Sequence, residues 1–224
     1  MNRAKIGFIL TALLFAVFIV FTVLTMTFDV GTTPTGDVGF YSLNVKVHEA
    51  VGTSRTWYTI TKILGFAAIA EAVFFAAAGL FTLIRRKSLK KVDGVFYALA
   101  ATYILLVVFY VAFELFPVNY RPFSFSEGAA PEASYPSTHT LLTVTVFMSG
   151  INFIGDFVND KRLFIILTSA SAALAVFTAV GRFLSGVHWL TDIAGGLILG
   201  VALTNFCFAL KEVIDSKKGS GIRE

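Results

Sequence analysis

The sequence predicts an all-α membrane protein, a bundle of six transmembrane helices. Its composition is the first observation: 56% of the 224 residues are hydrophobic, 14% are charged and the mean hydropathy is +0.79, too apolar for a soluble domain of this length. The second observation is a series of apolar runs long enough to cross a bilayer as helices. We expect one membrane-embedded domain over residues 1–224, with spans at about 6–28, 58–84, 95–116, 137–153, 163–180 and 192–210.

The first apolar run, 6–28, follows Arg3 and Lys5. A signal peptide would explain the position of this run, but the run is too long for a signal h-region and no small-x-small cleavage site follows it. We therefore interpret it as a transmembrane span. In the polar connection that follows, residues 40–48 are expected to lie along the membrane interface as an amphipathic segment, with His48 as a solvated surface histidine.

The second span carries two ionisable residues, Lys62 near its start and Glu71 near its middle. A carboxyl group inside the membrane faces the bundle or a wet cavity, which makes Glu71 a candidate functional residue. An equally open interpretation is structural: a protonated or hydrogen-bonded Glu71 would hold helices together.

The later part of the chain alternates apolar spans with short polar connections. The loop 117–136 contains four of the five prolines. Small residues at 170–173 and at Gly196 and Gly200 predict faces on which helices approach closely. The single cysteine, Cys207, has no partner for a disulfide or a cysteine metal site, and we interpret it as a core residue.

The distribution of positive charge predicts the orientation in the membrane. Six spans place both termini on one side, and 13 of the 18 Lys and Arg residues fall on that side. By the positive-inside rule the termini are cytoplasmic, and the segments 117–136 and 181–192 lie together on the outer face. The net charge of +4 then reflects topology and anionic lipid, so we expect a multi-pass protein of the cell membrane and no nucleic-acid partner. The 13 residues are Arg3, Lys5, Arg85, Arg86, Lys87, Lys90, Lys91, Lys161, Arg162, Lys211, Lys217, Lys218 and Arg223.

Two histidines stand in polar segments at the predicted outer edge, and one of them has a carboxylate nearby. His188 and Asp192 are four residues apart at the head of the sixth span, so on a helix they share one face. We expect the carboxylate to accept a hydrogen bond from the imidazole of His188. Such a bond selects the tautomer and leaves the other ring nitrogen free to attack a substrate.

The second histidine, His139, belongs to a set suited to binding an anion. Ser137 and Thr138 precede it at the predicted start of the fourth span, where unpaired N–H groups and the helix dipole favour negative charge. Arg121 and Arg182 supply planar, permanently charged groups that match phosphate oxygens. Two histidines, two arginines and a helix N-terminus together predict phosphoryl transfer without a metal.

These segments resemble a known family. The pattern Pro136-Ser137-x-His139, and Arg182 followed by His188 and Asp192, resemble the second and third motifs of the type-2 phosphatidic acid phosphatase superfamily. That superfamily includes the membrane lipid phosphate phosphatases and the soluble vanadium haloperoxidases. Arg121 with the proline after it matches the end of the first motif. The motif segments are residues 114–122, 136–139 and 182–192.

The resemblance implies a role for each motif residue. His188 would be the nucleophile, Asp192 would orient it, and His139 would protonate the leaving oxygen and then activate water. The phosphate would be held by Arg121, Arg182, Ser137 and the backbone at Thr138.

Two positions depart from the family pattern. Thr138 replaces the small residue usually found before the second-motif histidine, and Glu114 stands where the family has lysine. A carboxylate repels a phosphate unless it is protonated or paired, so we expect Glu114 to pair with Arg121 or Arg182. Lys62 is a candidate substitute cation.

The function that the resemblance implies is an integral membrane lipid phosphatase at the outer leaflet, without a cofactor and acting through a phosphohistidine. Its substrate would be a polyprenyl pyrophosphate, phosphatidylglycerol phosphate or phosphatidic acid. A lipid phosphotransferase with the same first half-reaction, a lipid carrier and a catalytically degenerate lipid-phosphate-binding protein remain alternatives. So does a zinc site of His139, His188 and Asp192, although two arginines at the same point disfavour a dication.

Overall fold

The computed structural model describes residues 3–125, 128 and 130–220, with only the backbone described for 218–220. The described residues form seven α-helices, six of which are long and apolar enough to cross a membrane. The six-span, all-α prediction is confirmed. The elements in chain order are α1 Arg3–Thr27, β1 Gly31–Thr33, β2 Gly36–Val38, α2 Tyr41–Val51, α3 Arg55–Arg86, the 3-10 turn η1 Leu89–Lys91, α4 Gly94–Leu115, α5 Thr138–Phe157, α6 Lys161–Ser185 and α7 Leu190–Ser220.

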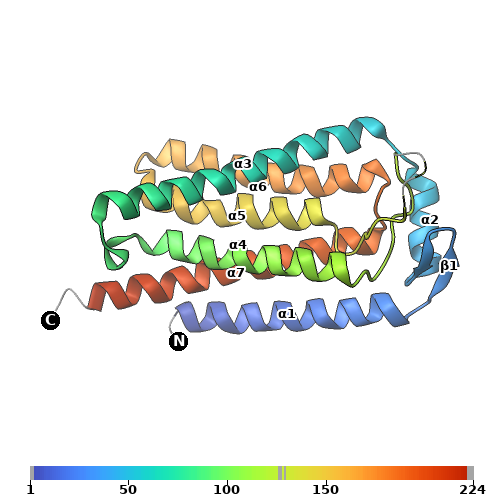
Figure 1. Cartoon of the computed structure of the whole chain (residues 1–224), viewed down its shortest axis with the longest axis horizontal. Coiled ribbons are helices and arrows are strands. Elements are labelled where there is room, and N and C mark those ends of the chain that lie inside the picture. Colours follow the sequence, from blue (N-terminus) through green and yellow to red (C-terminus); the bar gives the residue numbers. More distant parts are fainter. Residues whose placement is uncertain (1–2, 126–127, 129, 221–224) are drawn as a thin grey trace.

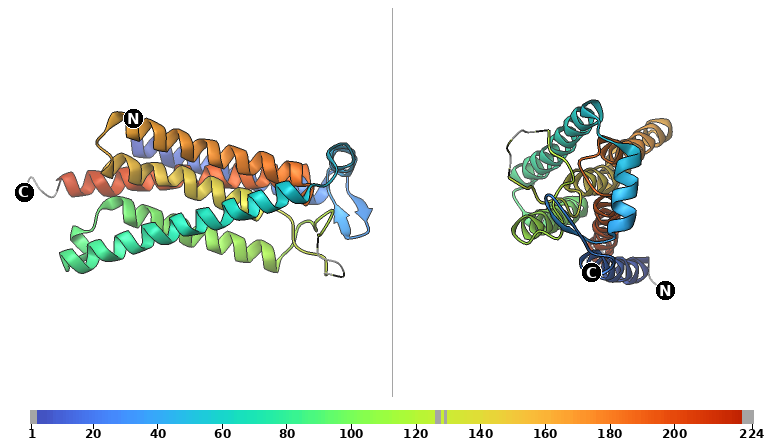
Figure 2. Two further views of the ribbon diagram at one scale, coloured as in Figure 1. Left: turned by 90° about the horizontal axis from the view of Figure 1, so that it is seen from above. Right: turned by 90° about the vertical axis from the view of Figure 1, so that its right-hand side faces the viewer.

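The six long helices lie side by side along one axis (Figure 1). Helix α2 and the small antiparallel hairpin of β1 and β2 lie across one end of this bundle, and α1 begins and α7 ends at the other (Figures 1 and 2). We call the end that carries α2 the capped end. The long loop between α4 and α5 also lies there, as six antiparallel spans require.

Several helices are longer than the apolar runs that predicted them. Helix α7 continues to Ser220, ten residues past the predicted end of the sixth span at 210. Its polar C-terminal part stays helical because Lys211 bonds both Asp215, one turn further on, and Asp156 at the end of α5, each at 2.8 Å. Helix α6 begins at its cap, where the side chain of Asp160 accepts a hydrogen bond from the backbone N–H of Leu163 at 2.7 Å.

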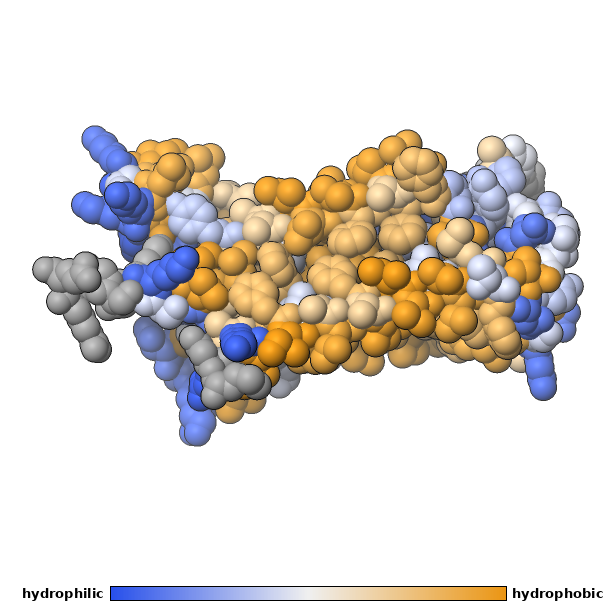
Figure 3. Space-filling view, turned by 90° about the horizontal axis from the view of Figure 1, so that it is seen from below, coloured by the Kyte–Doolittle hydropathy of each residue, from blue (hydrophilic) through white to orange (hydrophobic). Residues whose placement is uncertain are grey.

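Helices α5 and α7 form the centre of the bundle. In each, 56% of the most apolar stretch is buried, against 11% for α1. Their close approach depends on a glycine, because a Cβ added at Gly200 would lie 2.8 Å from a methyl carbon of Val144. The prediction of close packing at this glycine is thus confirmed. Around this centre, the outer surface of the bundle is apolar between two polar ends, as a surface facing lipid chains requires (Figure 3).

Helix α2 is fixed to the start of α7 by one buried amide. The side chain of Asn44 donates to the hydroxyl of Thr191 at 3.0 Å and accepts from the Thr191 backbone N–H at 3.3 Å. One turn on, His48 packs edge to face against Trp189, with ring centroids 5.5 Å apart. The prediction of a solvated His48 is therefore wrong: the ring is half-buried, and burial lowers the pKa of His48 although nearby Glu49 raises it.

Candidate active site

The candidate site lies at the capped end, where α6 ends and α5 and α7 begin. The loop between α4 and α5 closes it through a short ladder: Tyr120 pairs with Ala133, the Arg121 N–H donates to the Glu132 carbonyl at 3.0 Å, and the Ser134 N–H donates to the Asn119 carbonyl at 2.9 Å. Opposite, the Ser137 N–H donates to the Asp192 carbonyl at 2.9 Å. The three motif segments are thereby brought to one place.

A tight turn between α6 and α7 carries His188. Gly186 begins it with a φ of +67°, a left-handed conformation that disfavours residues with a Cβ. A Cβ at this position would also lie 2.0 Å from the carbonyl oxygen of Gly52. The glycine therefore allows the turn to pack against the segment before α3, and it leaves His188 only 4% exposed.

His188 is held from both sides of its ring. Its Nε2 lies 2.8 Å from an Nη atom of Arg182, and its Nδ1 lies 3.2 Å from the hydroxyl of Ser134. The Asp192 carboxylate lies 3.6 Å from Nδ1, too far for a hydrogen bond. The direct bond between His188 and Asp192 that the sequence predicts is therefore not formed, because Ser134 lies between them and donates to the carboxylate.

The carboxylate of Asp192 is fully buried and accepts three hydrogen bonds. Besides Ser134, the donors are the Trp189 backbone N–H at 2.8 Å and the Asn119 side chain at 3.1 Å. Sequence analysis missed Ser134 and Asn119. Both stand in the loop 117–136, and only the ladder within that loop, which residue spacing does not reveal, brings them to Asp192.

The charges around His188 keep its imidazole neutral. Its pKa lies well below the ordinary value, first because the ring is buried and then because Arg182, Arg121 and His139 bring positive charge close to it. A hydrogen bond with the backbone of Ser134 opposes this shift without reversing it. A neutral imidazole is the form that can act as a nucleophile. Arg121 and His139 therefore act on the ring electrostatically, in addition to Arg182, which contacts it.

Three buried nitrogens in this cluster have no hydrogen-bond partner among the described residues: Nε of Arg121, Nε of Arg182 and Nδ1 of His139. Buried polar groups are normally satisfied, so such a group of unsatisfied nitrogens indicates a ligand. Two of them belong to guanidinium groups, which suit an anion with several oxygens. The arrangement is that of a phosphate or a similar oxyanion site next to a neutral, buried imidazole.

Comparison with known families agrees with this geometry. Residues 116–214, which include the loop ladder, His139 and the segment from Arg182 to Asp192, match the family model of the PAP2 superfamily. This part of the chain is therefore similar to the PAP2 superfamily, the family that its motifs resemble. The six apolar helices make it a multi-pass membrane protein, and the family match relates it to phosphatases.

A solved structure of a PAP2 protein has a similar fold. It is described as the crystal structure of the first transmembrane PAP2 type phosphatidylglycerolphosphate phosphatase from Bacillus subtilis. The match covers 92% of this chain and 96% of that one, with a TM-score of 0.63 and 16% sequence identity. A search of curated protein sequences found no match.

The structure also places the remaining residues predicted for the candidate site. Ser137 is buried at the N-terminus of α5, and its hydroxyl accepts a hydrogen bond from Thr140 at 3.0 Å. Thr138 is the first residue of α5, where backbone N–H groups lack helical partners. Gly65 allows the ring of His139 to approach α3, because an added Cβ there would lie 2.8 Å from that ring.

Glu114 does not take the part expected of it. It is exposed in the last turn of α4, and neither of the two expected pairings is found within the described residues. Arg121 instead pairs with Glu132 at 3.0 Å, and Arg182 bonds His188. The departure from the PAP2 pattern at Glu114 therefore places no carboxylate against the phosphate site.

Lys62 and Glu71 lie on α3 at different depths. Lys62 lines a cavity of about 400 Å³ between α3 and α4, and Thr138 and His139 line the same cavity. Glu71 lies about two turns further along α3, where its carboxylate packs against α5 at Gly150, beside Phe75. Lys62 thus lies next to the candidate site, whereas Glu71 lies at a contact between helices.

The zinc alternative fits this arrangement poorly. Both ring nitrogens of His188 already have partners in Arg182 and Ser134, and the Asp192 oxygens have three donors. To bind zinc, His188 and Asp192 would have to break these hydrogen bonds, and the positive charges of Arg121 and Arg182 would still repel the metal ion. Among the described residues, no group of three or more His, Cys, Asp or Glu side chains is arranged to hold a metal ion.

Proposed function

We propose that this protein is an integral membrane lipid phosphatase that hydrolyses the phosphomonoester or pyrophosphate of a lipid through a phosphohistidine. The observation that carries the proposal is a neutral, buried His188 beside three unsatisfied buried nitrogens of Arg121, Arg182 and His139. Preorganised donors of this kind stabilise the charge of a transferring phosphoryl group.

In the first half-reaction the lone pair of Nε2 of His188 attacks phosphorus. Arg182, which donates to Nε2 in the free protein, transfers its hydrogen bond to a phosphate oxygen and so frees the lone pair. The bond between phosphorus and the lipid oxygen breaks, and that oxygen takes a proton from His139. The products are a lipid alcohol or lipid monophosphate and a phosphohistidine at residue 188.

In the second half-reaction water replaces the lipid. His139, which became neutral in the first step, accepts a proton from the water while the water oxygen attacks phosphorus. The N–P bond breaks and its electron pair returns to Nε2. Inorganic phosphate leaves, His188 is again neutral and His139 again carries a proton.

The cavity between α3 and α4 suits a lipid tail. The two helices diverge toward the capped end (Figure 1), and the cavity between them is lined mainly by apolar side chains, among them Phe66, Ile69 and Val107. These three are 61%, 47% and 58% exposed, so the cavity is open toward the lipid phase. A tail can remain among apolar groups while the phosphate meets His139 and Lys62 at the polar end.

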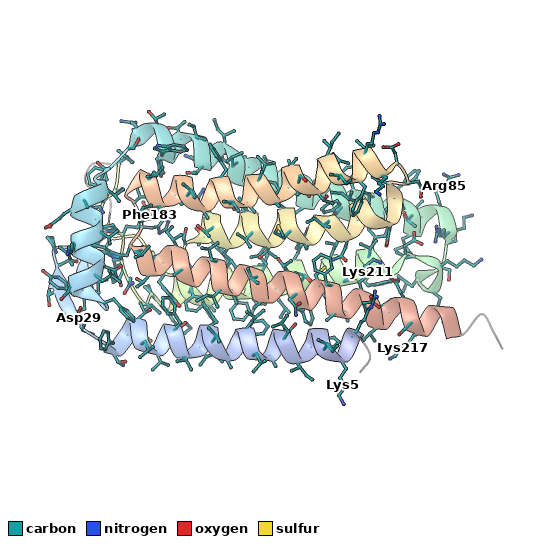
Figure 4. All side chains as sticks on the ribbon, turned by 180° about the vertical axis from the view of Figure 1, so that it is seen from behind. Lys5, Asp29, Arg85, Phe183, Lys211 and Lys217 are labelled. Atoms are coloured by element: carbon teal, nitrogen blue, oxygen red, sulfur yellow. The ribbon has the colours of Figure 1, made fainter. Side chains whose placement is uncertain are left out.

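Charge supports an active site on the outer face and cytoplasmic termini. Lys5, Arg85, Lys211 and Lys217 lie at the end opposite the capped end, far from Phe183 (Figure 4). The positive-inside rule assigns such an end to the cytoplasm. Of the cations counted in the sequence, Arg223 lies outside the described residues and the side chain of Lys218 is not described.

The test is phosphate release by the detergent-purified protein in EDTA, with phosphatidic acid, phosphatidylglycerol phosphate and a polyprenyl pyrophosphate as substrates. We expect release by the wild type, none by His188→Ala, and losses of about 10³-fold or more in His139→Ala and Asp192→Asn. Binding without release would indicate a degenerate binding protein or a carrier, and phosphate appearing on a second lipid would indicate a transferase. Activity that requires added zinc would contradict the proposal.

A further inference from the structure

We propose that Ser134 is a positioning residue that connects Asp192 to the nucleophile, so that the orientation of His188 depends on the loop between α4 and α5. The inference rests on the proposed function. It concerns a side chain outside the motif positions that sequence analysis selected, on a segment separate from the turn that carries His188.

The first argument is the geometry of the three side chains. The Ser134 hydroxyl donates its single proton to the Asp192 carboxylate, so toward His188 it can act only as an acceptor. Nδ1 of His188, 3.2 Å away, must then carry the proton, and the lone pair lies on Nε2. The 3.6 Å between Nδ1 and the carboxylate leaves Asp192 without a direct bond that could select this tautomer.

The second argument is that the carboxylate is held in place by other groups. Trp189 donates its backbone N–H to the oxygen that also receives Ser134, and Asn119 donates to the other oxygen. Asp192 is therefore a fixed acceptor that orients the hydroxyl of Ser134, and the hydroxyl in turn orients the imidazole. Ser134 itself is 2% exposed, which excludes most solvent from this arrangement.

The third argument is how the loop holds Ser134. Its backbone N–H donates to Asn119, the residue whose side chain supports Asp192. The next residue, Tyr135, is bonded through its hydroxyl to Thr22 of α1 at 2.8 Å. Arg121 stands in the same ladder through its bond to the Glu132 carbonyl. One loop thus positions both a phosphate-binding arginine and the hydroxyl that orients the nucleophile.

The chemical role requires no additional proton transfer. When Nε2 forms its bond to phosphorus and the lipid oxygen leaves with the proton of His139, the imidazole of His188 becomes positive while Nδ1 keeps its proton. The Ser134 hydroxyl accepts that stronger N–H bond and continues to donate to Asp192, so the negative charge of Asp192 stabilises the cation through the hydroxyl. This stabilisation arises only once Nε2 has begun to bond phosphorus, because the imidazole is neutral before that.

The experiment compares Ser134→Ala with Ser134→Thr, which keeps the hydroxyl, and with Ser149→Ala as the matched control. Ser149 is also fully buried and hydrogen-bonded, to Tyr103 at 3.2 Å, but it lies in the middle of the bundle. We would measure kcat and KM for phosphate release, and the binding of orthovanadate and of inorganic phosphate by thermal shift. Orthovanadate tests the Nε2 lone pair, since it can form a bond to the imidazole, whereas phosphate tests the arginines.

We expect Ser134→Ala to lower kcat and orthovanadate affinity by about 10- to 100-fold, the range for partners that orient an imidazole ligand, with KM and phosphate affinity little changed. Ser134→Thr should retain more activity, and Ser149→Ala should behave as the wild type. The inference is overturned if Ser134→Ala keeps kcat and orthovanadate affinity, or loses orthovanadate and phosphate affinity equally. A wild type that neither releases phosphate nor binds orthovanadate overturns the proposed function and this inference together; normal turnover in Ser134→Ala overturns this inference alone.

Discussion

Arg182 donates a hydrogen bond to Nε2 of His188, the nitrogen that would attack phosphorus. The guanidinium is itself fully buried, 3.5 Å from the hydroxyl of Thr61 and 5.5 Å from the ring centre of Tyr58. These contacts keep the guanidinium beside the imidazole, so a phosphate bound to His188 would take over the hydrogen bond that Arg182 donates to Nε2. In the free protein the arginine holds the ring in place, and in the complex it would hold the phosphate.

Replacing Arg182 should affect catalysis more than folding of the helices. We expect Arg182→Gln to lower kcat/KM for phosphate release by about 10²- to 10³-fold, the usual loss when one donor to a transition-state oxyanion is removed. Arg182→Lys should restore little, because an ammonium cannot replace the planar fork that serves His188 and the phosphate. Kinetics of the two variants in detergent would check this, and full activity in Arg182→Lys would contradict it.

Lys62 and Glu114 provide a matched pair on the two helices that border the cavity. Lys62→Met removes the cation that lines the cavity beside His139, so KM for a lipid phosphate should rise, by about tenfold if one charge-assisted hydrogen bond is lost. Glu114→Gln should leave KM unchanged, because this side chain is exposed at the end of α4. Steady-state kinetics on one lipid phosphate would distinguish them. The opposite pattern would show that Glu114, and not Lys62, acts on the substrate.

The burial of His188 predicts how stability depends on pH. Because its pKa in the folded protein is lowered from the ordinary value of about 6.5, the unfolded chain binds a proton that the folded chain does not. The associated stability is therefore complete above about pH 6.5 and is lost as the pH falls below that value. Melting temperatures in detergent should fall from pH 7 to pH 5 more steeply in the wild type than in His188→Gln. Parallel curves would contradict a lowered pKa.

Gly52 and Gly186 both have a positive φ but differ in what surrounds them. At Gly52 φ is +68° and ψ is −156°, a region open essentially to glycine alone, and at Gly186 they are +67° and 13°, the left-handed helical region. An added Cβ meets nothing within 4 Å at Gly52 and lies 2.0 Å from a carbonyl oxygen at Gly186. Gly52→Ala should cost about 1–3 kcal/mol of stability through backbone strain and retain phosphate release, whereas Gly186→Ala should displace the turn that carries His188 and lower phosphate release as well. Thermal unfolding and phosphate release would check both, and equal losses of phosphate release would exclude a contribution from packing at Gly186.

The fold could be predicted further than the site because apolar run length determines which segments can cross a bilayer. Helix ends such as that of α7 were less predictable, since ion pairs at Lys211 extend the helix beyond the apolar run. In the site, the four-residue separation of His188 and Asp192 predicted that the two side chains lie close together, and in the structure they are 3.6 Å apart. It could not show that Ser134 lies between them, because that depends on the conformation of a loop more than 50 residues earlier in the chain.

The identity of the covalent intermediate tests the central claim most directly. A lipid phosphate substrate would be mixed with the wild type, with His139→Ala and with His188→Ala, and each reaction quenched in alkali, in which phosphohistidine is stable. Mass spectrometry would then locate the phosphate. The account predicts a phosphoryl group on His188 that forms in the wild type and is absent in His188→Ala. In His139→Ala it should form more slowly, because the leaving oxygen lacks its acid, and decay more slowly, because water is no longer activated. A phosphoryl group on another residue, or undiminished phosphate release by His188→Ala, would contradict it.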